Sequence, residues 1–455
     1  MGKGGESAPV PPQLASHWTS PYNPLDPKAP KLPTKGEIKA VIPKECFERS
    51  YIKGLSWVLF DVGVMTLLVF TAKSLLSTTP PQVMISAGGL FWVLGWSVYA
   101  FCMGSTLWGV WTLAHECGHG ALFPSRTCNE IFGFVLYQAI LSPYFPWRYL
   151  HSKHHQYTNN LHKDTHWSPD TLSDIGMRNE KENMRENNSF RASVLRKVGN
   201  GPFSACFLLF VGTTYTSFLF GVGAFCRTCR TNYDGTPSKQ GKFSILNPWS
   251  KLLPPKLRAK SVLSTLTFAA SIVGLAKLAF CHTLLSVALW YGFPIVLLYF
   301  WGFIYSFLHH TDPSVPVYGN DEWTWMRGAL TTIDRDYGIF NFFHHQMGST
   351  HVVHHLFHEI PFYNAVKATN AVKDYLEPQG LYNFDPTPWW KALWRTFRKC
   401  QHIDDTSGVQ YKRSFDDIVP MLRFKKEWIA SHSSCPTPFA NMSGFLHVKL
   451  ATPTL

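Results

Sequence analysis

The sequence predicts an all-α integral membrane protein, in which four transmembrane helices form two hairpins that carry a cytosolic helical cap. Three observations predict it. The 455 residues are 45% hydrophobic and only 16% charged, with 17 Trp and 34 Phe, which is typical of chains with apolar spans and interfacial aromatic residues. Four long apolar runs come in two pairs, and clusters of histidine follow the runs.

The first two apolar runs, about 55–76 and 90–114, are each long enough to cross a bilayer. Lys and Arg residues precede the first run, so by the positive-inside rule the chain starts in the cytosol and returns there just before His115. We expect Asp61, inside the first run, to lie near the membrane interface. Residues 1–50 are predicted to be a cytosolic segment, without the apolar core of a signal peptide or the Arg-rich pattern of a transit peptide.

The second pair of runs, 261–280 and 283–308, is joined only by Cys281 and His282, which predicts a second hairpin. An apolar stretch at 203–225 is also long enough to span. If it spanned, the last histidine cluster would face the other side of the membrane, and the loop 226–260 after it is strongly basic, which marks a cytosolic loop. We therefore expect 203–225, and the shorter stretch 131–145, to lie at the interface.

The residues between 51 and 430 are predicted to form one domain, followed by a poorly ordered tail at 431–455. Trp323, Trp325, Trp389 and Trp390 are expected at the membrane surface, where Trp is common. The net charge of +13 comes largely from basic residues between apolar runs, so it indicates a membrane protein and no nucleic-acid partner. The 10 Cys are scattered and form no disulfide framework.

Three short clusters concentrate the histidines: HECGH at 115–119, HSKHH at 151–155 and HVVHH at 351–355. On a helix, positions i, i+3 and i+4 share one face, so each cluster aims its imidazoles one way. Imidazole suits Zn, Cu, Fe and Ni, and one zinc is usually satisfied by four ligands. These histidines are too many for one ion and predict a two-metal site. They are His115, His119, His151, His154, His155, His351, His354 and His355.

Two interpretations of this chemistry stay open. HECGH has the H-E-x-x-H form of zinc proteases, in which Glu116 would be the general base. Against it, Gly118 is a poor residue for a helix interior, and the other two clusters lack a carboxylate. Iron can bind and reduce O2, whereas zinc has no redox chemistry. The histidine excess therefore favours a di-iron, oxygen-activating centre.

The clusters and the text around them resemble the membrane fatty acid desaturases, and most closely the delta-12 (omega-6) oleate desaturases of algal and diatom type. The resemblance covers roughly residues 20–415. The stretches that carry it are GEIK at 36–39, IPKECFERS at 42–50, AHECGHG at 114–120, RGAL at 327–330, TIDR at 332–335 and STHVVHHLF at 349–357.

The resemblance implies O2-dependent conversion of oleoyl to linoleoyl chains, with the acyl chain in a bent tunnel. An omega-3 desaturase or an acyl hydroxylase would share the same clusters. It also implies that the eight histidines, together with His310 and His345, bind the metals. His309 stands where the family usually has Gln, and Gly120 replaces a second His found in many plant members, so neither is expected to be a ligand. Residues expected to support or surround the ligands are Glu116, Asp164, Asp312, Asp334, His162, His166, His309, His344 and His358.

The implied cofactors are two iron ions, and the implied substrates are an oleoyl lipid and O2. Electrons are expected from an external donor, either cytochrome b5 with an NADH-dependent reductase or, in a plastid, ferredoxin. The expected location is the endoplasmic reticulum membrane with the metals facing the cytosol, and a plastid membrane is the alternative. The basic loop 226–260 would suit an acidic donor protein or anionic lipid equally well.

Overall fold

The structure is a computed structural model of the 455-residue chain. It describes residues 22–26, 28–166, 168–171, 206–207, 209–210, 218–219, 230–237 and 244–414. Most of the predicted interfacial stretch 203–225, part of the basic loop 226–260 and the tail 431–455 lie outside the described residues.

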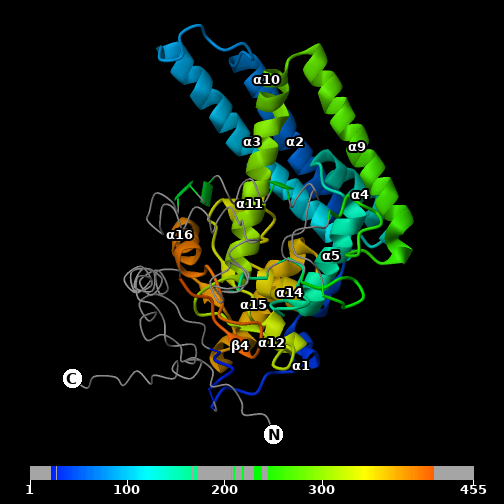
Figure 1. The fold of residues 1–455 in the computed structure, drawn as a ribbon, viewed down its shortest axis with the longest axis vertical. Coiled ribbons are helices and arrows are strands. Elements are labelled where there is room, and N and C mark those ends of the chain that lie inside the picture. The colour runs from blue at the N-terminus through cyan, green and yellow to red at the C-terminus, as the bar shows by residue number, and fades with distance from the viewer. Residues whose placement is uncertain are drawn as a thin grey trace, which may run out of the picture. The chain divides into compact units, whose positions relative to one another are not determined.

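Within the described residues, four helices are long and apolar enough to cross a membrane, and they correspond to the four predicted spans. Figure 1 shows them side by side in one half of the molecule. Their outward faces expose large apolar side chains such as Leu59, Phe70 and Val273, as expected for surfaces that face lipid. The spans are Tyr51–Leu75 (α2), Ala87–His119 (α3), Pro255–Cys281 (η4 Pro255–Leu257 and α9 Arg258–Cys281) and Leu284–His310 (α10 Leu284–Val287, π-helix η5 Ala288–Gly292 and α11 Phe293–His310).

The ends of α3 fix where the first histidine cluster lies. Ser86 caps the start by accepting from the backbone N–H of Gly89. At the other end, Gly120 has φ 71°, the left-handed conformation in which glycine commonly terminates a helix. The span therefore continues as helix through both His115 and His119, and Gly118 sits one position from the last helical residue.

The packing of α3 against α11 brings histidines from two spans to the same end. Gly104 allows the close approach, because a Cβ there would lie 2.9 Å from the carbonyl oxygen of Pro294. Nearer the site, the indole of Trp301 donates to the Ser105 hydroxyl over 2.9 Å. These contacts fix the relative height of His115 on α3 and His310 on α11.

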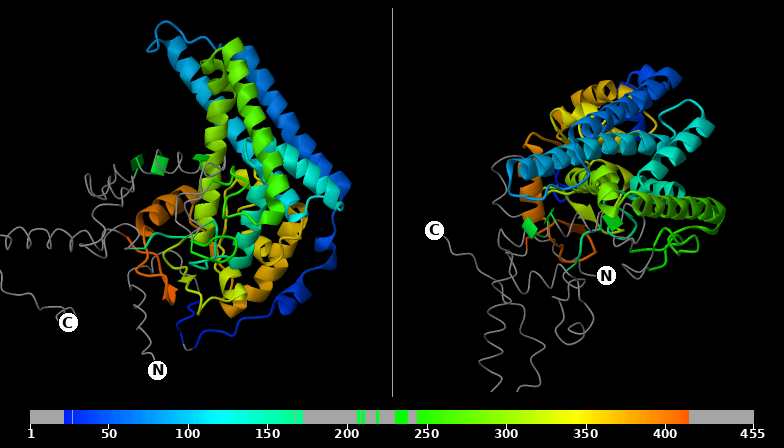
Figure 2. Two further views of the ribbon diagram at one scale, coloured as in Figure 1. Left: turned by 45° about the vertical axis from the view of Figure 1, so that its right-hand side comes forward. Right: turned by 90° about the horizontal axis from the view of Figure 1, so that it is seen from above.

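The remaining elements gather at the histidine end of the spans (Figure 1 and Figure 2). Apolar residues 131–145 are split between α4 and α5 by a turn at 140–143. The fold is mostly helical rather than all-α, because the described residues include four two-residue strands that join distant loops: β1 pairs antiparallel with β4, and β2 parallel with β3. The elements are α1 (Lys35–Val41), η2 (Lys44–Phe47), α4 (Arg126–Ala139), α5 (Tyr144–Tyr157), β1 (Val317–Tyr318), α12 (Trp325–Ala329), β2 (Asp334–Arg335), α13 (Phe340–Phe343), α14 (His351–Leu356), α15 (Phe362–Leu376), η6 (Glu377–Gln379), β3 (Phe384–Asp385), α16 (Trp389–Lys399) and β4 (Val409–Gln410).

Candidate metal centre

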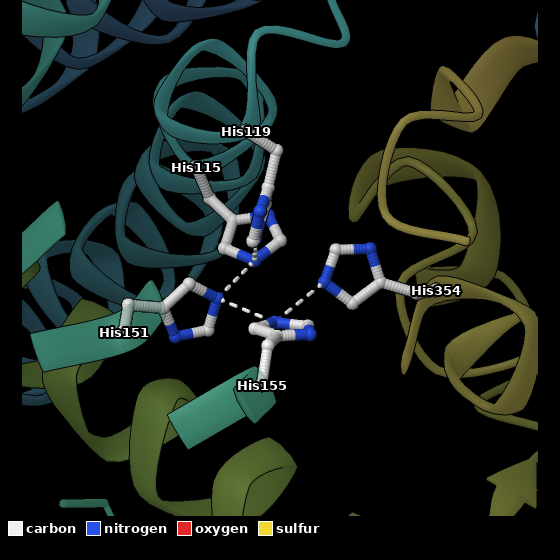
Figure 3. A group of neighbouring side chains, drawn as sticks. All are labelled: His115, His119, His151, His155 and His354. Carbon is white, nitrogen blue, oxygen red and sulfur yellow. Dashed lines mark hydrogen bonds between the residues drawn. The ribbon is translucent and has the colours of Figure 1, made fainter. Parts of the chain in front are cut away.

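Five imidazoles from three helices converge on one point (Figure 3). One ring nitrogen of each lies within 4.8 Å of the others. The Nε2 atom of His151 lies 2.7 Å from that of His115 and 2.9 Å from that of His155. The group is made of His115 and His119 from α3, His151 and His155 from α5, and His354 from α14.

A second group lies next to the first. Nitrogens of His154, His310 and His355 lie within 4.8 Å of one another. The Nε2 atom of His351 joins them, at 3.2 Å from Nε2 of His310. The structure thus brings the eight histidines of the three clusters and His310 into two adjacent groups, as the two-metal prediction requires.

Each H-x-x-H-H cluster contributes to both groups. In α5, the i and i+4 residues His151 and His155 enter the first group and the i+3 residue His154 enters the second. In α14 the roles are exchanged: His354 enters the first group, whereas His355 enters the second. The sequence analysis did not predict that the histidines of one cluster would be divided between the two groups.

The structure does not place His345 with either group. Its Nε2 lies 2.9 Å from Oδ2 of Asp61 on α2, and its ring packs edge-on against Trp57 at 5.1 Å. Asp61 is only 2% exposed, so its contact with His345 is buried. We therefore do not retain His345 as a proposed ligand, although the family resemblance implied one.

Polar side chains hold the outer nitrogens of several rings. Asp164 Oδ1 lies 2.8 Å from Nδ1 of His154, as expected for this residue. The Thr158 hydroxyl lies 3.0 Å from Nδ1 of His355. A metal-bound imidazole needs such a partner to fix its tautomer and its plane. These two contacts leave the Nε2 atoms of His154 and His355 for the second group.

Glu116 also lies on the outer side of the rings. One of its carboxylate oxygens is 3.4 Å from Nδ1 of His115, and the other accepts from the backbone N–H of Phe362 over 3.0 Å. The Nε2 atom of His115 points the opposite way, into the first group. A general base of a zinc protease would have to face the metal side, so this geometry does not fit the protease interpretation.

Two other acidic residues contact a backbone N–H group and an arginine rather than the histidine rings. Asp334 accepts from the backbone N–H of Val352 over 2.8 Å, which caps the start of α14, and also from the Tyr382 hydroxyl. Asp312 lies 2.8 Å from a guanidinium nitrogen of Arg395. Among the described residues, neither carboxylate contacts a ring of the two groups, so any support that they give to the imidazoles is indirect.

The extra histidines surround the centre. His309 contacts the carbonyl of Ile333, and the Tyr305 hydroxyl contacts His344 over 2.8 Å. His358 stacks on the ring of His119 at 4.9 Å. His166 lies 3.4 Å from Nδ1 of His151, and His162 lies 3.1 Å from the carbonyl of Thr406.

The donor set fits metal ions that prefer imidazole. Burial lowers the pKa of His151 and His155 in α5, and of His351, His354 and His355 in α14, well below the usual value. These rings are therefore neutral, which is the form that binds metal. Within the described residues, Nε2 of His355 is buried without a hydrogen-bond partner. A bound metal ion would satisfy it.

Comparisons with known proteins agree with this geometry. Residues 90–386 match the family model described as fatty acid desaturase. The chain belongs to the fatty acid desaturase family. It is 32% identical over 414 residues to the Delta(12)-fatty-acid desaturase of Vernicia fordii, covering 90% of this chain and 98% of that protein.

Two further relatives show the range of named activities around this desaturase. The omega-6 fatty acid desaturase, endoplasmic reticulum, of Brassica juncea is 32% identical, with 84% of this chain and 90% of that protein covered. The oleoyl-12-hydroxylase of Ricinus communis is also 32% identical, with 83% and 88% covered. Overall identity therefore does not separate desaturation from hydroxylation.

Sequence reasoning missed several contacts of the desaturase centre. Thr158 lies 197 residues before its partner His355, and Lys412, which donates to the carbonyl oxygen of His310 over 3.1 Å, lies 102 residues after it. Neither residue belongs to a motif. The only signal in the sequence was proximity of Thr158 to the second cluster.

Proposed function

We propose that this protein is a membrane-bound acyl-lipid delta-12 (omega-6) desaturase that converts oleoyl to linoleoyl chains with a di-iron centre. The observation that carries the proposal is the pair of adjacent imidazole groups at the end of the spans. Similarity to named Delta(12) and omega-6 desaturases supports the position of the double bond.

The residues proposed to hold the first iron are the five of the first group, and those for the second are His154, His310, His351 and His355. Bound iron would supply the redox chemistry, in which O2 becomes two waters with two hydrogen atoms from adjacent methylenes and two electrons and two protons from outside. The chain's own part is to hold the rings. Asp164 keeps the proton of His154 on Nδ1, and burial of both groups limits bulk water.

The external electrons are proposed to come from cytochrome b5 with an NADH-dependent reductase, or from ferredoxin if the protein lies in a plastid. The proposed location is the endoplasmic reticulum membrane, with the four spans in two hairpins and the metal end in the cytosol. The name of the Brassica juncea relative supports the endoplasmic reticulum as the location. The basic residues before α2 support the cytosolic orientation of the metal end.

The test is expression in a yeast that makes oleate but no polyunsaturated fatty acids, followed by gas chromatography of the fatty acid methyl esters. We expect a linoleate peak, and none from the His155→Ala variant at equal expression. A peak of alpha-linolenate after feeding of linoleate would instead establish an omega-3 desaturase. A hydroxylated product would establish the second candidate function, an acyl hydroxylase, which similarity to the Ricinus communis oleoyl-12-hydroxylase favours. No product from well-expressed, iron-loaded protein would refute the proposal.

A further inference from the structure

The helix α16 combines a buried apolar face with a basic, tryptophan-rich outer face. Its sequence, WWKALWRTFRK, contains no acidic residue. Ala392, Leu393 and Phe397 are buried, whereas Trp390 is 57% exposed. The outer face is formed by Trp390, Lys391, Trp394, Arg398 and Lys399.

The position of α16 along α11 gives its depth relative to the membrane. Trp389 packs against Trp301 at 5.3 Å, and Phe397 against Phe307 at 6.4 Å. A bilayer core takes roughly 20 helical residues, which from Leu284 ends near Phe303. The contacts of α16 fall on either side of that level, so the helix lies at the height of the lipid headgroups.

The chemistry of the outer face suits anionic lipid. Trp favours the membrane interface, and Lys and Arg near the surface are attracted to anionic headgroups. The Arg398 guanidinium lies 5.8 Å from the Trp394 ring, over its face, which keeps the cation beside an apolar surface. Basic helices with this pattern lie in the interface of a membrane.

We propose that α16 is an interfacial helix whose outer face binds the anionic phospholipid headgroups of the membrane that the four helices span. The helix is also joined to the metal end of α11. Arg395, the basic residue that turns inward, lies 2.8 Å from Asp312 and 2.7 Å from Asp385, and Asp312 follows the proposed ligand His310 by two residues. Binding of lipid to α16 therefore stabilises the loop that continues from the second histidine group.

The experiment measures hydrogen exchange of the α16 backbone amides in the full-length protein, reconstituted in nanodiscs of phosphatidylcholine alone or mixed with phosphatidylserine. Both lipids carry only saturated chains, so that an effect of the oleoyl substrate is excluded. We expect exchange to slow on the order of tenfold in the anionic discs, because the basic residues of the outer face are attracted to an anionic surface. The slowing should disappear in high salt, which screens exposed charges.

The variant Lys391→Gln/Arg398→Gln/Lys399→Gln should lose the slowing. The matched control, Lys28→Gln/Lys31→Gln/Lys44→Gln, removes three exposed basic residues from the N-terminal segment around α1, outside α16, and should keep the slowing. Equal exchange in both kinds of disc would overturn the proposal and leave the face to an acidic protein partner. Slowing that survives in the α16 variant would overturn it too. If that variant fails to fold, the salt series on the unchanged protein decides.

Discussion

Asp164 gives the sharpest test of how the chain holds its metals. Its Oδ1 lies 2.8 Å from Nδ1 of His154, and it also accepts from two backbone N–H groups, those of Asn159 and His166, each at 2.8 Å. Replacing it in the Asp164→Ala variant frees the ring of His154 to rotate and to change tautomer. Because His154 belongs to the second group alone, the loss should fall on one of the two metals.

The expected size follows from the single ring contact. Removing a partner that orients a ligand costs roughly 10–100-fold in metal affinity, which is ~1.4–2.7 kcal/mol. Loss of one charge-assisted hydrogen bond, about 1.5–3 kcal/mol, gives the same range. The two backbone contacts stabilise the turn after α5, so a lower unfolding temperature should accompany the loss of metal.

The assay is iron per chain after equilibration with increasing concentrations of a chelator. Asp164→Ala should release one of its two irons at a chelator concentration roughly 10–100-fold below that needed for the unchanged protein. The control is Asp374→Ala, which removes an exposed carboxylate from α15. Parallel release of both irons would refute the assignment of His154 to one group, and unchanged release would refute the role of Asp164.

Three further outcomes follow from the structure. The His345→Ala variant should keep its iron but unfold at a lower temperature, and Asp61→Asn should lower the unfolding temperature equally. The His310→Ala variant should instead lose about one iron. Loss of iron from His345→Ala would show that His345 is a ligand. His355→Ala should abolish desaturation at normal expression, and retained product would remove it from the ligands. Burial would raise the pKa of Asp385, but Arg335 beside it lowers that pKa to about 2. The ionised Asp385 carboxylate therefore stabilises the fold fully above the unfolded-state pKa of ~3.9. This stabilisation is lost as the pH falls through about 2. At ~1.4 kcal/mol per unit, on the order of 2 kcal/mol should disappear from the unfolding free energy across that window, and Asp385→Asn should show a flatter pH dependence; equal slopes would contradict this.

The four spans of the described residues were predictable because each is a long apolar run. The predicted first span, about 55–76, corresponds to α2 at Tyr51–Leu75, which begins where Ser50 caps it. The second differs more. Apolarity ends near Ala114, but the helix continues to His119, where Gly120 ends it in the left-handed conformation. The position of the capping glycine, rather than the change from apolar to polar residues, therefore sets the C-terminal end of α3.

Contacts between distant segments were not predictable. Asp61 and His345 are 284 residues apart, and nothing in a single sequence marks two polar residues as partners. The two-residue strands are similar: β2 is too short for an alternating pattern, so nothing in the sequence marks its pairing with β3. The family resemblance still predicted His310, and the last turn of α11 brings it to the same end as the clusters.

The division of each H-x-x-H-H cluster follows from the angle of a helical step. With 3.6 residues per turn, positions i and i+4 differ by about 40° around the axis, whereas i+3 lies about 100° from i+4. The two nearly aligned imidazoles therefore reach one metal and the third reaches another. In α5 the aligned pair His151 and His155 serves the first group, and in α14 the pair His351 and His355 serves the second. Each helix thus contacts both proposed metals, so a shift of either helix would change both sites together.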